Sequence, residues 1–168
     1  MPDAVAVAGL EIRLARETDV PIIVSLIRAL ADYEKAAPDA VPVTETGLRE
    51  MLFGSYPAAE VLLACMSAEV AGYAIFFHNF SSWRGRRGLY LEDLFVRPEW
   101  RRHGIGKAIM RELAKIALER GCVRMEWLVL DWNQSAIDFY CSLGGEPLAE
   151  WTTFRLADAD LQTLAAQP

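Results

Sequence analysis

Apolar and polar positions in the first third of the chain follow two different periods. Residues 10–14 alternate between apolar and polar side chains, which predicts a strand. After a Thr18 N-cap, apolar residues recur at helical spacing as far as about Tyr33, which predicts a helix. A shorter helix is expected after the Thr44 cap. The residues expected on its buried side are Leu48, Met51 and Leu52.

The middle of the chain has the pattern of a hairpin followed by a further strand. Two apolar runs, 61–66 and 70–77, are separated by three residues, which predicts two antiparallel strands. The stretch 83–88 is rich in Gly and Arg and predicts a solvated turn. Residues 89–96 predict the next strand, which Pro98 ends.

The last third alternates between helical and extended patterns. A helix is expected after the 101–106 loop and as far as Arg120, with Gly121 as the residue that ends it. Its apolar stripe is Ile105, Ile109, Leu113 and Ala117. Residues 122–130 predict a strand, 133–143 a short helix that ends at a Gly pair, and 150–156 the last strand.

This order of elements predicts an α/β (α+β) domain built on one mixed sheet. The length of 168 residues fits a single domain over residues 1–168. Residues 1–9 and 164–168 are expected to be frayed ends.

Composition narrows the possible partners and compartments. Lys and Arg number 17 against 23 Asp and Glu, a formal net charge of −6, which argues against nucleic acid as the main partner. The 3 cysteines form no C-x-x-C pair and there are 2 histidines, so we expect no disulfide framework, no metal site and a reducing, cytoplasmic location. No signal peptide or membrane-spanning segment is expected either.

The clearest chemical signal lies between a predicted strand and a predicted helix. Its residues are Arg101, Arg102, His103, Gly104, Ile105, Gly106 and Lys107. Glycines allow a ligand to approach the backbone closely, and the open N–H groups of a helix start favour a phosphate. Positive side chains are unfavourable at a helix N-terminus unless an anion is bound there. The pattern is neither a P-loop nor a dinucleotide fingerprint.

Two further stretches carry polar residues in otherwise apolar surroundings. Glu92 and Asp93 are adjacent in a predicted strand, so strict alternation would place their side chains on opposite faces. A salt bridge at a strand end is the structural alternative for them. At the start of the following short helix, Asn133 is a capping residue, and Tyr140 lies one to two turns further on. Taken alone, Tyr140 is more typical of a core aromatic residue than of a catalyst.

Taken together, these stretches resemble the GNAT superfamily of acetyl-CoA-dependent N-acetyltransferases. The finer resemblance is to the diamine acetyltransferase family, which includes spermidine/spermine and thialysine enzymes. The resemblance covers about residues 12–156. The stretches that carry it are Leu30-Ala31-x-Tyr33-Glu34, Tyr90-Leu91-Glu92-Asp93, Arg101-x-x-Gly104-Ile105-Gly106, Val129-Leu130-Asp131-Trp132-Asn133-Gln134, Phe139-Tyr140 and Leu143-Gly144.

The resemblance implies a largely antiparallel sheet that splays apart at the acetyl-CoA site. The pyrophosphate of acetyl-CoA would lie on the 101–107 loop and the pantetheine arm along the preceding strand. The cofactor residues so implied are the seven of the loop together with Leu94, Phe95, Val96, Asn133, Gln134, Ser135, Ala136 and Tyr140.

The resemblance also implies a direct attack of the acceptor amine on the thioester. Glu92, directly or through a water, would take the proton of the ammonium group. Tyr140 would protonate the departing thiolate, and a phenol with its ordinary pKa of about 10 suits that leaving group. No metal takes part.

The amine pocket implied by the resemblance is aromatic and acidic, which suits an alkylammonium chain. Its residues are Tyr33, Glu34, Glu92, Glu126, Trp127, Leu128 and Thr152. Thr152 stands where polyamine enzymes have a glutamate, and residues 130–134 are closer to the thialysine branch. A small diamine, a polyamine and a thialysine-like ω-amino acid are all candidate acceptors.

Two alternatives belong to different functional classes. One is a protein or peptide N-acetyltransferase, which needs an open groove, whereas Tyr33, Trp83 and Trp127 suit a closed pocket. The other is a non-catalytic CoA-binding regulatory module, which would be expected to lack Glu92 or Tyr140. The resemblance further implies a homodimer in which the C-terminal strand joins the partner's sheet, with no nucleic acid or membrane partner.

Overall fold

A computed structural model describes residues 7–37 and 40–168. The fold divides into two compact units, residues 1–128 and 129–168. Residues 1–6, most of the segment expected to be frayed, lie outside the described residues.

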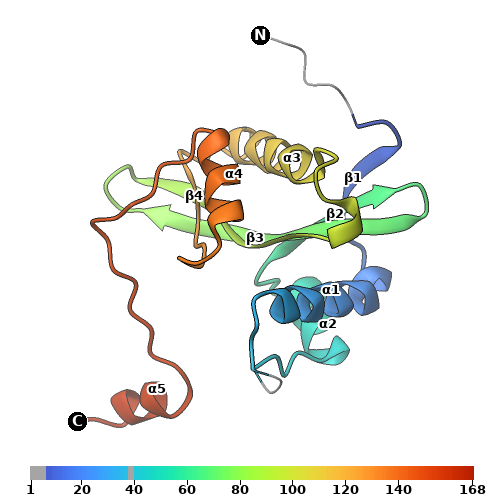
Figure 1. Cartoon of the computed structure of the whole chain (residues 1–168). Coiled ribbons are helices and arrows are strands. Elements are labelled where there is room, and N and C mark those ends of the chain that lie inside the picture. Colours follow the sequence, from blue (N-terminus) through green and yellow to red (C-terminus); the bar gives the residue numbers. More distant parts are fainter. Residues whose placement is uncertain (1–6, 38–39) are drawn as a thin grey trace. The chain divides into compact units, whose positions relative to one another are not determined.

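The first unit is built on a five-stranded sheet with the order β1-β2-β3-β4-β5 (Figure 1). The strands are β1 (Leu10–Leu14), β2 (Glu60–Met66), β3 (Glu69–Ser81), β4 (Arg86–Val96) and β5 (Met125–Trp127). Neighbours from β1 to β4 pair antiparallel, and β4 pairs with β5 in parallel. The predicted mixed, largely antiparallel sheet is confirmed.

Helices cover both faces of this sheet (Figure 1). On one face lie α1 (Val20–Tyr33) and α2 (Glu45–Phe53), and on the other lies α3 (Ile105–Glu119). Two short 3-10 helices, η1 (Glu17–Asp19) and η2 (Pro98–Trp100), precede α1 and α3. The predicted stripe of α3 is buried along its whole length, and Gly121 has the left-handed φ of +70° expected after the helix.

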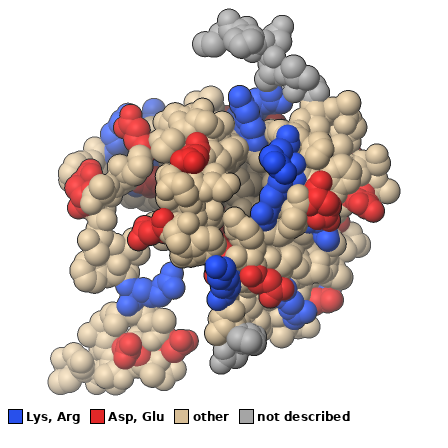
Figure 2. Space-filling model, viewed as in Figure 1, with Lys and Arg blue, Asp and Glu red and all other residues tan. Residues whose placement is uncertain are grey.

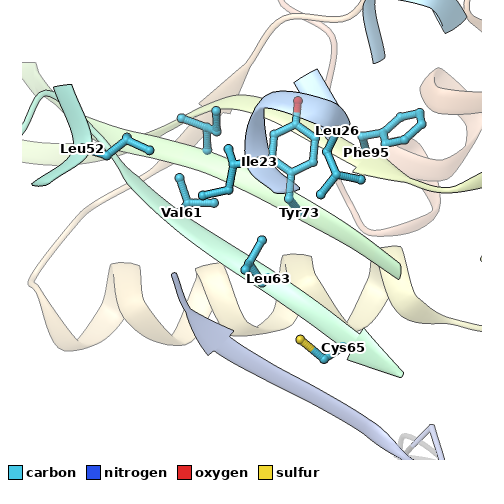
Figure 3. Close-up of a cluster of buried hydrophobic side chains, with 9 residues drawn as sticks. Ile23, Leu26, Leu52, Val61, Leu63, Cys65, Tyr73 and Phe95 are labelled. Carbon is cyan, nitrogen blue, oxygen red and sulfur yellow. The ribbon is translucent and has the colours of Figure 1, made fainter. Parts of the chain in front are cut away.

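A cluster of buried apolar side chains fills the space between the sheet and α1 and α2 (Figure 3). It joins residues of α1 and α2 to residues of β2, β3 and β4 that lie on one face of the sheet. Its members are Ile23, Leu26, Leu52, Val61, Leu63, Cys65, Tyr73, Ile75 and Phe95. Tyr73 carries the one hydroxyl in this group, and its ring has no exposed surface.

Two expectations for the helices of the first unit are wrong. The N-cap position of α1 is held by Asp19 and not by Thr18, and the Asp19 side chain caps no N–H of α1. It instead accepts the backbone N–H of Arg16 at the start of η1 at 2.7 Å and pairs with Arg13 at 2.7 Å. Met51 is 51% exposed, whereas Leu52 is buried. The Thr44 cap is confirmed, since its Oγ1 accepts the N–H of Gly47 at 3.1 Å.

The strand boundaries also differ from the predictions. The turn between β3 and β4 is shorter than residues 83–88, because β4 already begins at Arg86 and pairs with the end of β3. The strand predicted over 122–130 is reduced to β5, since only three residues reach β4 in pairing register. Edge strands that pair over so few residues are not distinguishable by hydropathy from the loop around them.

The second unit consists of two helices joined by an extended segment. They are α4 (Gln134–Ser142) and α5 (Asp158–Ala165). The side chain of Asn133 accepts the N–H of Ala136 at 3.3 Å, which confirms the predicted cap of α4. The strand expected over 150–156 is absent from the described chain, and α5 includes Leu164 and Ala165, which were expected to be frayed.

Candidate active site

The 101–107 loop forms an open, positively charged helix start. Arg102 and Gly104 both have left-handed φ angles, +64° and +81°, which turn the chain from η2 into α3. Gly104 is the N-cap of α3, so no side chain caps the first N–H groups of the helix. Lys and Arg side chains gather over this start of α3 (Figure 2). This combination of open donors and positive charge is suited to a phosphate.

Arg101 connects the loop to the C-terminal end of α1. Its Nε donates to the carbonyl of Val96 at 2.9 Å, which fixes the side chain against β4. Its guanidinium carbon lies 4.3 Å from the centre of the Tyr33 ring and 5.6 Å from that of Phe95. A residue predicted to contact the cofactor therefore also contacts Tyr33, which was predicted to contact the amine.

One edge of β4 is open next to this loop. Pairing with β5 joins residues 89–91 to Met125–Trp127 and ends there. Within the described chain, residues 92–96 have no strand partner on that edge. An amide-containing chain could hydrogen-bond there in the manner of an added strand. Leu94, Phe95 and Val96, predicted to hold the pantetheine arm, all lie in this open stretch.

A β-bulge interrupts β4 at Glu92. Leu91 pairs with Phe76 of β3 and Asp93 pairs with Ile75, so Glu92 has no counterpart in β3. The prediction that Glu92 and Asp93 point to opposite faces assumed strict alternation along β4, and the bulge interrupts that alternation between Leu91 and Asp93. Glu92 is exposed and Asp93 is half-buried. The bulge lies where the ladder with β5 also ends.

Asp93 has the most altered carboxyl group near this open edge. Burial raises its pKa, the charges of Glu92 and Glu34 raise it further, and a hydrogen bond from Tyr73 opposes them, with a resulting pKa of about 6. The Tyr73 hydroxyl donates to Asp93 Oδ2 at 3.0 Å. A carboxylate whose pKa lies close to neutral pH is well suited to accept a proton.

Sequence reasoning found part of this carboxylate cluster and missed part. Glu34 and Glu92 were predicted, and their charges reach Asp93 as described above. Asp93 was noted as a neighbour without a role, although two adjacent acids in an apolar strand were a usable signal. Tyr73 was missed altogether, because nothing in its local sequence distinguishes it from a core aromatic residue.

The predicted amine residues of β5 have a different environment. Glu126 accepts the side-chain amide of Asn79 at 2.7 Å and pairs with Arg124 at 2.8 Å. Its negative charge is thus already paired with Arg124, a residue of the same unit. Trp127 is the last residue of β5, and Leu128 follows it with 60% of its surface exposed.

Trp83 lies at the exposed tip of the β3–β4 hairpin. It is 90% exposed, and the six residue-to-residue steps of β4 from Arg86 to Glu92 span about 20 Å. Trp83 therefore does not close a pocket over Glu92 of its own chain. A shallow hollow of about 520 Å³ near this tip is lined by none of the predicted site residues. Its lining is Phe80, Gly85, Arg86, Arg87, Arg120 and Gly121.

The remaining predicted residues belong to the second unit. Asn133, Gln134, Ser135 and Ala136 form the cap and first turn of α4, where Gln134 also bonds to Asp138. Tyr140 lies in the same helix, with its ring 5.2 Å from that of Phe139. Thr152 lies in the extended segment between α4 and α5, next to the exposed Trp151.

Metal-binding groups and membrane-spanning helices are two features that the described part of the chain lacks. Within it, no group of three or more His, Cys, Asp or Glu side chains could hold a metal ion. Over the same residues, no helix has both the length and the apolar character needed to cross a membrane. Cys65, Cys122 and Cys141 are free thiols.

The known proteins that this chain resembles in sequence include N-acetyltransferases. Residues 26–144 match the acetyltransferase (GNAT) family. The chain is 40% identical over 167 residues to a thialysine N-epsilon-acetyltransferase of Bos taurus, covering 93% of this chain and 97% of that protein. It is 33% identical over 198 residues to an L-ornithine N5-acetyltransferase of Arabidopsis thaliana, covering 91% of this chain and 86% of that protein.

Solved structures share the same architecture. An integron cassette protein from the mobile metagenome of V. cholerae matches with a TM-score of 0.80 and 26% identity, over 95% of this chain and 99% of that one. An aminoglycoside acetyltransferase from an uncultured soil metagenomic sample matches with a TM-score of 0.71 and 23% identity, over 90% and 96%. The second of these shows likeness of fold alone.

Proposed function

Because the chain belongs to the acetyltransferase (GNAT) family, whose acetyl donor is acetyl-CoA, we propose that it acetylates the side-chain amine of a small ω-amino acid. The activity itself, amine N-acetyl transfer, follows from the family and from relatives at 33–40% identity. Neither the protein-acetylating nor the non-catalytic alternative is favoured by these relatives. The observation that carries the choice of a cationic acceptor is the group of Glu34, Glu92 and Asp93 beside the open edge of β4.

The donor would be held by main-chain groups at the start of α3 and along the open edge of β4. The open N–H groups and positive side chains at the start of α3 suit its pyrophosphate. The unpaired edge of residues 94–96 suits its amide-containing arm, and an N–H of that edge would stabilise the oxyanion formed at the thioester carbonyl. Asn133 to Ala136 of the second unit complete the proposed set of contacts.

The acceptor amine would arrive as an ammonium ion, attracted by the three carboxylates. Glu92, exposed at the bulge, would take its proton directly or through a water, with Asp93 beside it. The neutral amine would then attack the thioester carbonyl carbon. Tyr140 would give its hydroxyl proton to the sulfur that leaves. The three free cysteines support a reducing, cytoplasmic location as part of the same proposal.

The preference for an amino acid over a diamine rests on the acceptors named for two relatives and on the positive charge of Arg101. Thialysine and ornithine, the acceptors named for two of the relatives, both carry an α-carboxylate as well as a terminal amine. In this chain the Arg101 guanidinium carbon lies 4.3 Å from the centre of the ring of Tyr33, the residue that precedes Glu34. A cation there would favour an acceptor with a negative group at its far end.

The test is a panel of acceptors matched in length. Ornithine and putrescine differ only in the α-carboxylate, as do lysine and cadaverine, and thialysine and spermidine complete the set. We expect kcat/KM, followed by thiol release from acetyl-CoA, to be at least tenfold higher for each amino acid than for its diamine. Equal or reversed ratios would assign the enzyme to diamines or polyamines. Acetyl-CoA binding without thiol release from any amine would contradict the proposal as a whole.

The proposed homodimer depends on the segment between α4 and α5. Trp151, Phe154 and Leu156 are 66%, 91% and 53% exposed, although residues 150–156 have the pattern of a strand. An exposed apolar segment of this kind is suited to pairing with another chain. We expect light scattering to give twice the chain mass of 18.8 kDa at micromolar concentration.

A matched pair of variants tests which aromatic residue matters to the assembly. Phe154→Asp should yield a monomer, whereas Tyr56→Asp, at a residue that is 93% exposed, should remain a dimer. A monomeric wild-type protein, or equal behaviour of the two variants, would contradict the proposed role of the segment.

A further inference from the structure

The hydroxyl of Tyr73 is a buried polar group that the mechanism above does not use. Tyr73 lies in β3 with no exposed surface, and its ring packs beside Leu26 and Phe95 (Figure 3). The centres of the Tyr73 and Phe95 rings are 6.4 Å apart. The hydroxyl donates to Asp93 Oδ2 at 3.0 Å, across the β3–β4 pair. This hydrogen bond therefore fixes one oxygen atom of the Asp93 carboxylate against the aromatic core.

Tyr73 can act only as a donor in this bond. Burial and the nearby charge of Asp93 raise the pKa of Tyr73 far above its ordinary value, so its proton stays in place at any working pH. Because the side chain has no exposed surface, it cannot touch an acceptor amine itself. Any effect of Tyr73 on the reaction has to pass through Asp93.

The groups facing Asp93 come from three directions. Glu92 precedes it in β4, Glu34 follows the end of α1, and Tyr73 comes from β3. Arg101, from the 101–107 loop, lies over the Tyr33 and Phe95 rings. The two neighbouring carboxylates and burial favour a protonated Asp93, and the Tyr73 bond favours an ionised one. A buried donor on a carboxylate stabilises its charged form.

We propose that Tyr73 is a positioning residue for acetyl transfer: its hydrogen bond holds the Asp93 carboxylate beside Glu92 and keeps it ionised, and so able to accept a proton, at neutral pH. This inference rests on the proposed function. It names a role that Glu92 and Tyr140 do not fill. It also explains why a hydroxyl stands at the centre of an otherwise apolar cluster.

The proton and electron pairs balance as follows. An N–H bond of the ammonium breaks as Glu92 takes its proton, and that proton then passes from Glu92 to form an O–H bond on Asp93. The freed lone pair of the amine forms the C–N bond to the thioester carbon, the C–S bond breaks, and the sulfur takes the Tyr140 proton. Asp93 and Tyr140 return to their starting states by proton exchange with solvent.

The first test compares Tyr73→Phe with the wild type over a range of pH. Removing the donor should raise the pKa of Asp93, so the acid limb of kcat/KM should move upward by about one pH unit. The loss should be about fivefold near pH 6, approach about tenfold below pH 5, and be absent near pH 9. Tyr56→Phe, at an exposed tyrosine outside the site, should leave the profile unchanged. A limb that stays in place in Tyr73→Phe would overturn the proposal.

Two further measurements separate this role from a merely structural one. Carbon-13 NMR of the Asp93 carboxyl should show the same upward shift of its pKa in Tyr73→Phe. This titration needs no substrate, so its result does not depend on whether the proposed acceptor is correct. In an Asp93→Asn background, Tyr73→Phe should cause no further loss of kcat/KM. The proposal would be refuted if Tyr73→Phe lowered kcat/KM equally in the wild-type and Asp93→Asn backgrounds, or if the pKa of Asp93 were the same with and without the Tyr73 hydroxyl. Should Tyr73→Phe fail to fold, Asp93→Asn alone should abolish the limb near pH 6, and persistence of that limb would refute the proposal.

Discussion

Replacement of Tyr140 by phenylalanine is expected to lower turnover by about 10²- to 10⁴-fold, which is the usual contribution of a general acid. The variant keeps the aromatic ring in α4, 5.2 Å from Phe139, and removes only the hydroxyl. Because Tyr140 donates late in the reaction, the affinity for acetyl-CoA and the KM for the amine should change little. The measurements are single-turnover rates and calorimetric binding of acetyl-CoA.

A matched control for this change is Tyr56→Phe, which removes the same atom from a 93% exposed residue. Its turnover should equal that of the wild type. If Tyr140→Phe also retains wild-type turnover under conditions where the chemical step limits the rate, the acid assignment is wrong. Water would then protonate the thiolate.

Replacement of Glu92 by glutamine is expected to lower turnover by about 10²-fold at neutral pH. The deficit should shrink as the pH rises, because more of the amine is then neutral before it binds and needs no base. Glu99→Gln, at an exposed residue of η2, is the control for the loss of one negative charge. Rates are measured for both variants over the same range of pH.

The pH dependence separates two roles of Glu92. A base gives a deficit in kcat that fades at high pH, whereas a residue that only attracts the cation gives mainly a higher KM. A constant kcat deficit at every pH would contradict the role of base. An unchanged kcat with a raised KM would assign Glu92 to binding alone.

Features that depend on nearby residues were predictable from the sequence. The stripe of α3, the Thr44 and Asn133 caps and the turn at Gly121 were all predicted, because each depends on side chains within one or two helical turns. The 101–107 loop was predictable for the same reason, since its glycines and basic residues are adjacent in the chain. Its open helix start is a local property.

Features that depend on pairing between distant segments were not predictable. The bulge at Glu92 is set by the register of β3 against β4, which alternation within β4 alone does not encode. The Tyr73–Asp93 bond crosses 20 residues of sequence and depends on that same register. The short length of β5 and the absence of a strand over 150–156 could not be predicted for the same reason. A strand forms only where another strand pairs with it, whatever its own β-propensity.

The Asp93 carboxyl also has a consequence for the stability of the folded chain. Its pKa rises from an ordinary value of 3.8 to about 6 on folding, so the folded chain binds this proton more tightly than the unfolded chain does. The resulting contribution to the free energy of unfolding is complete below about pH 4 and is lost as the pH rises through about 6. At neutral pH the ionised group therefore leaves the fold about 3 kcal/mol less stable than it is in acid. An asparagine would avoid that penalty, so the natural chain retains at position 93 an acid that its fold would be more stable without.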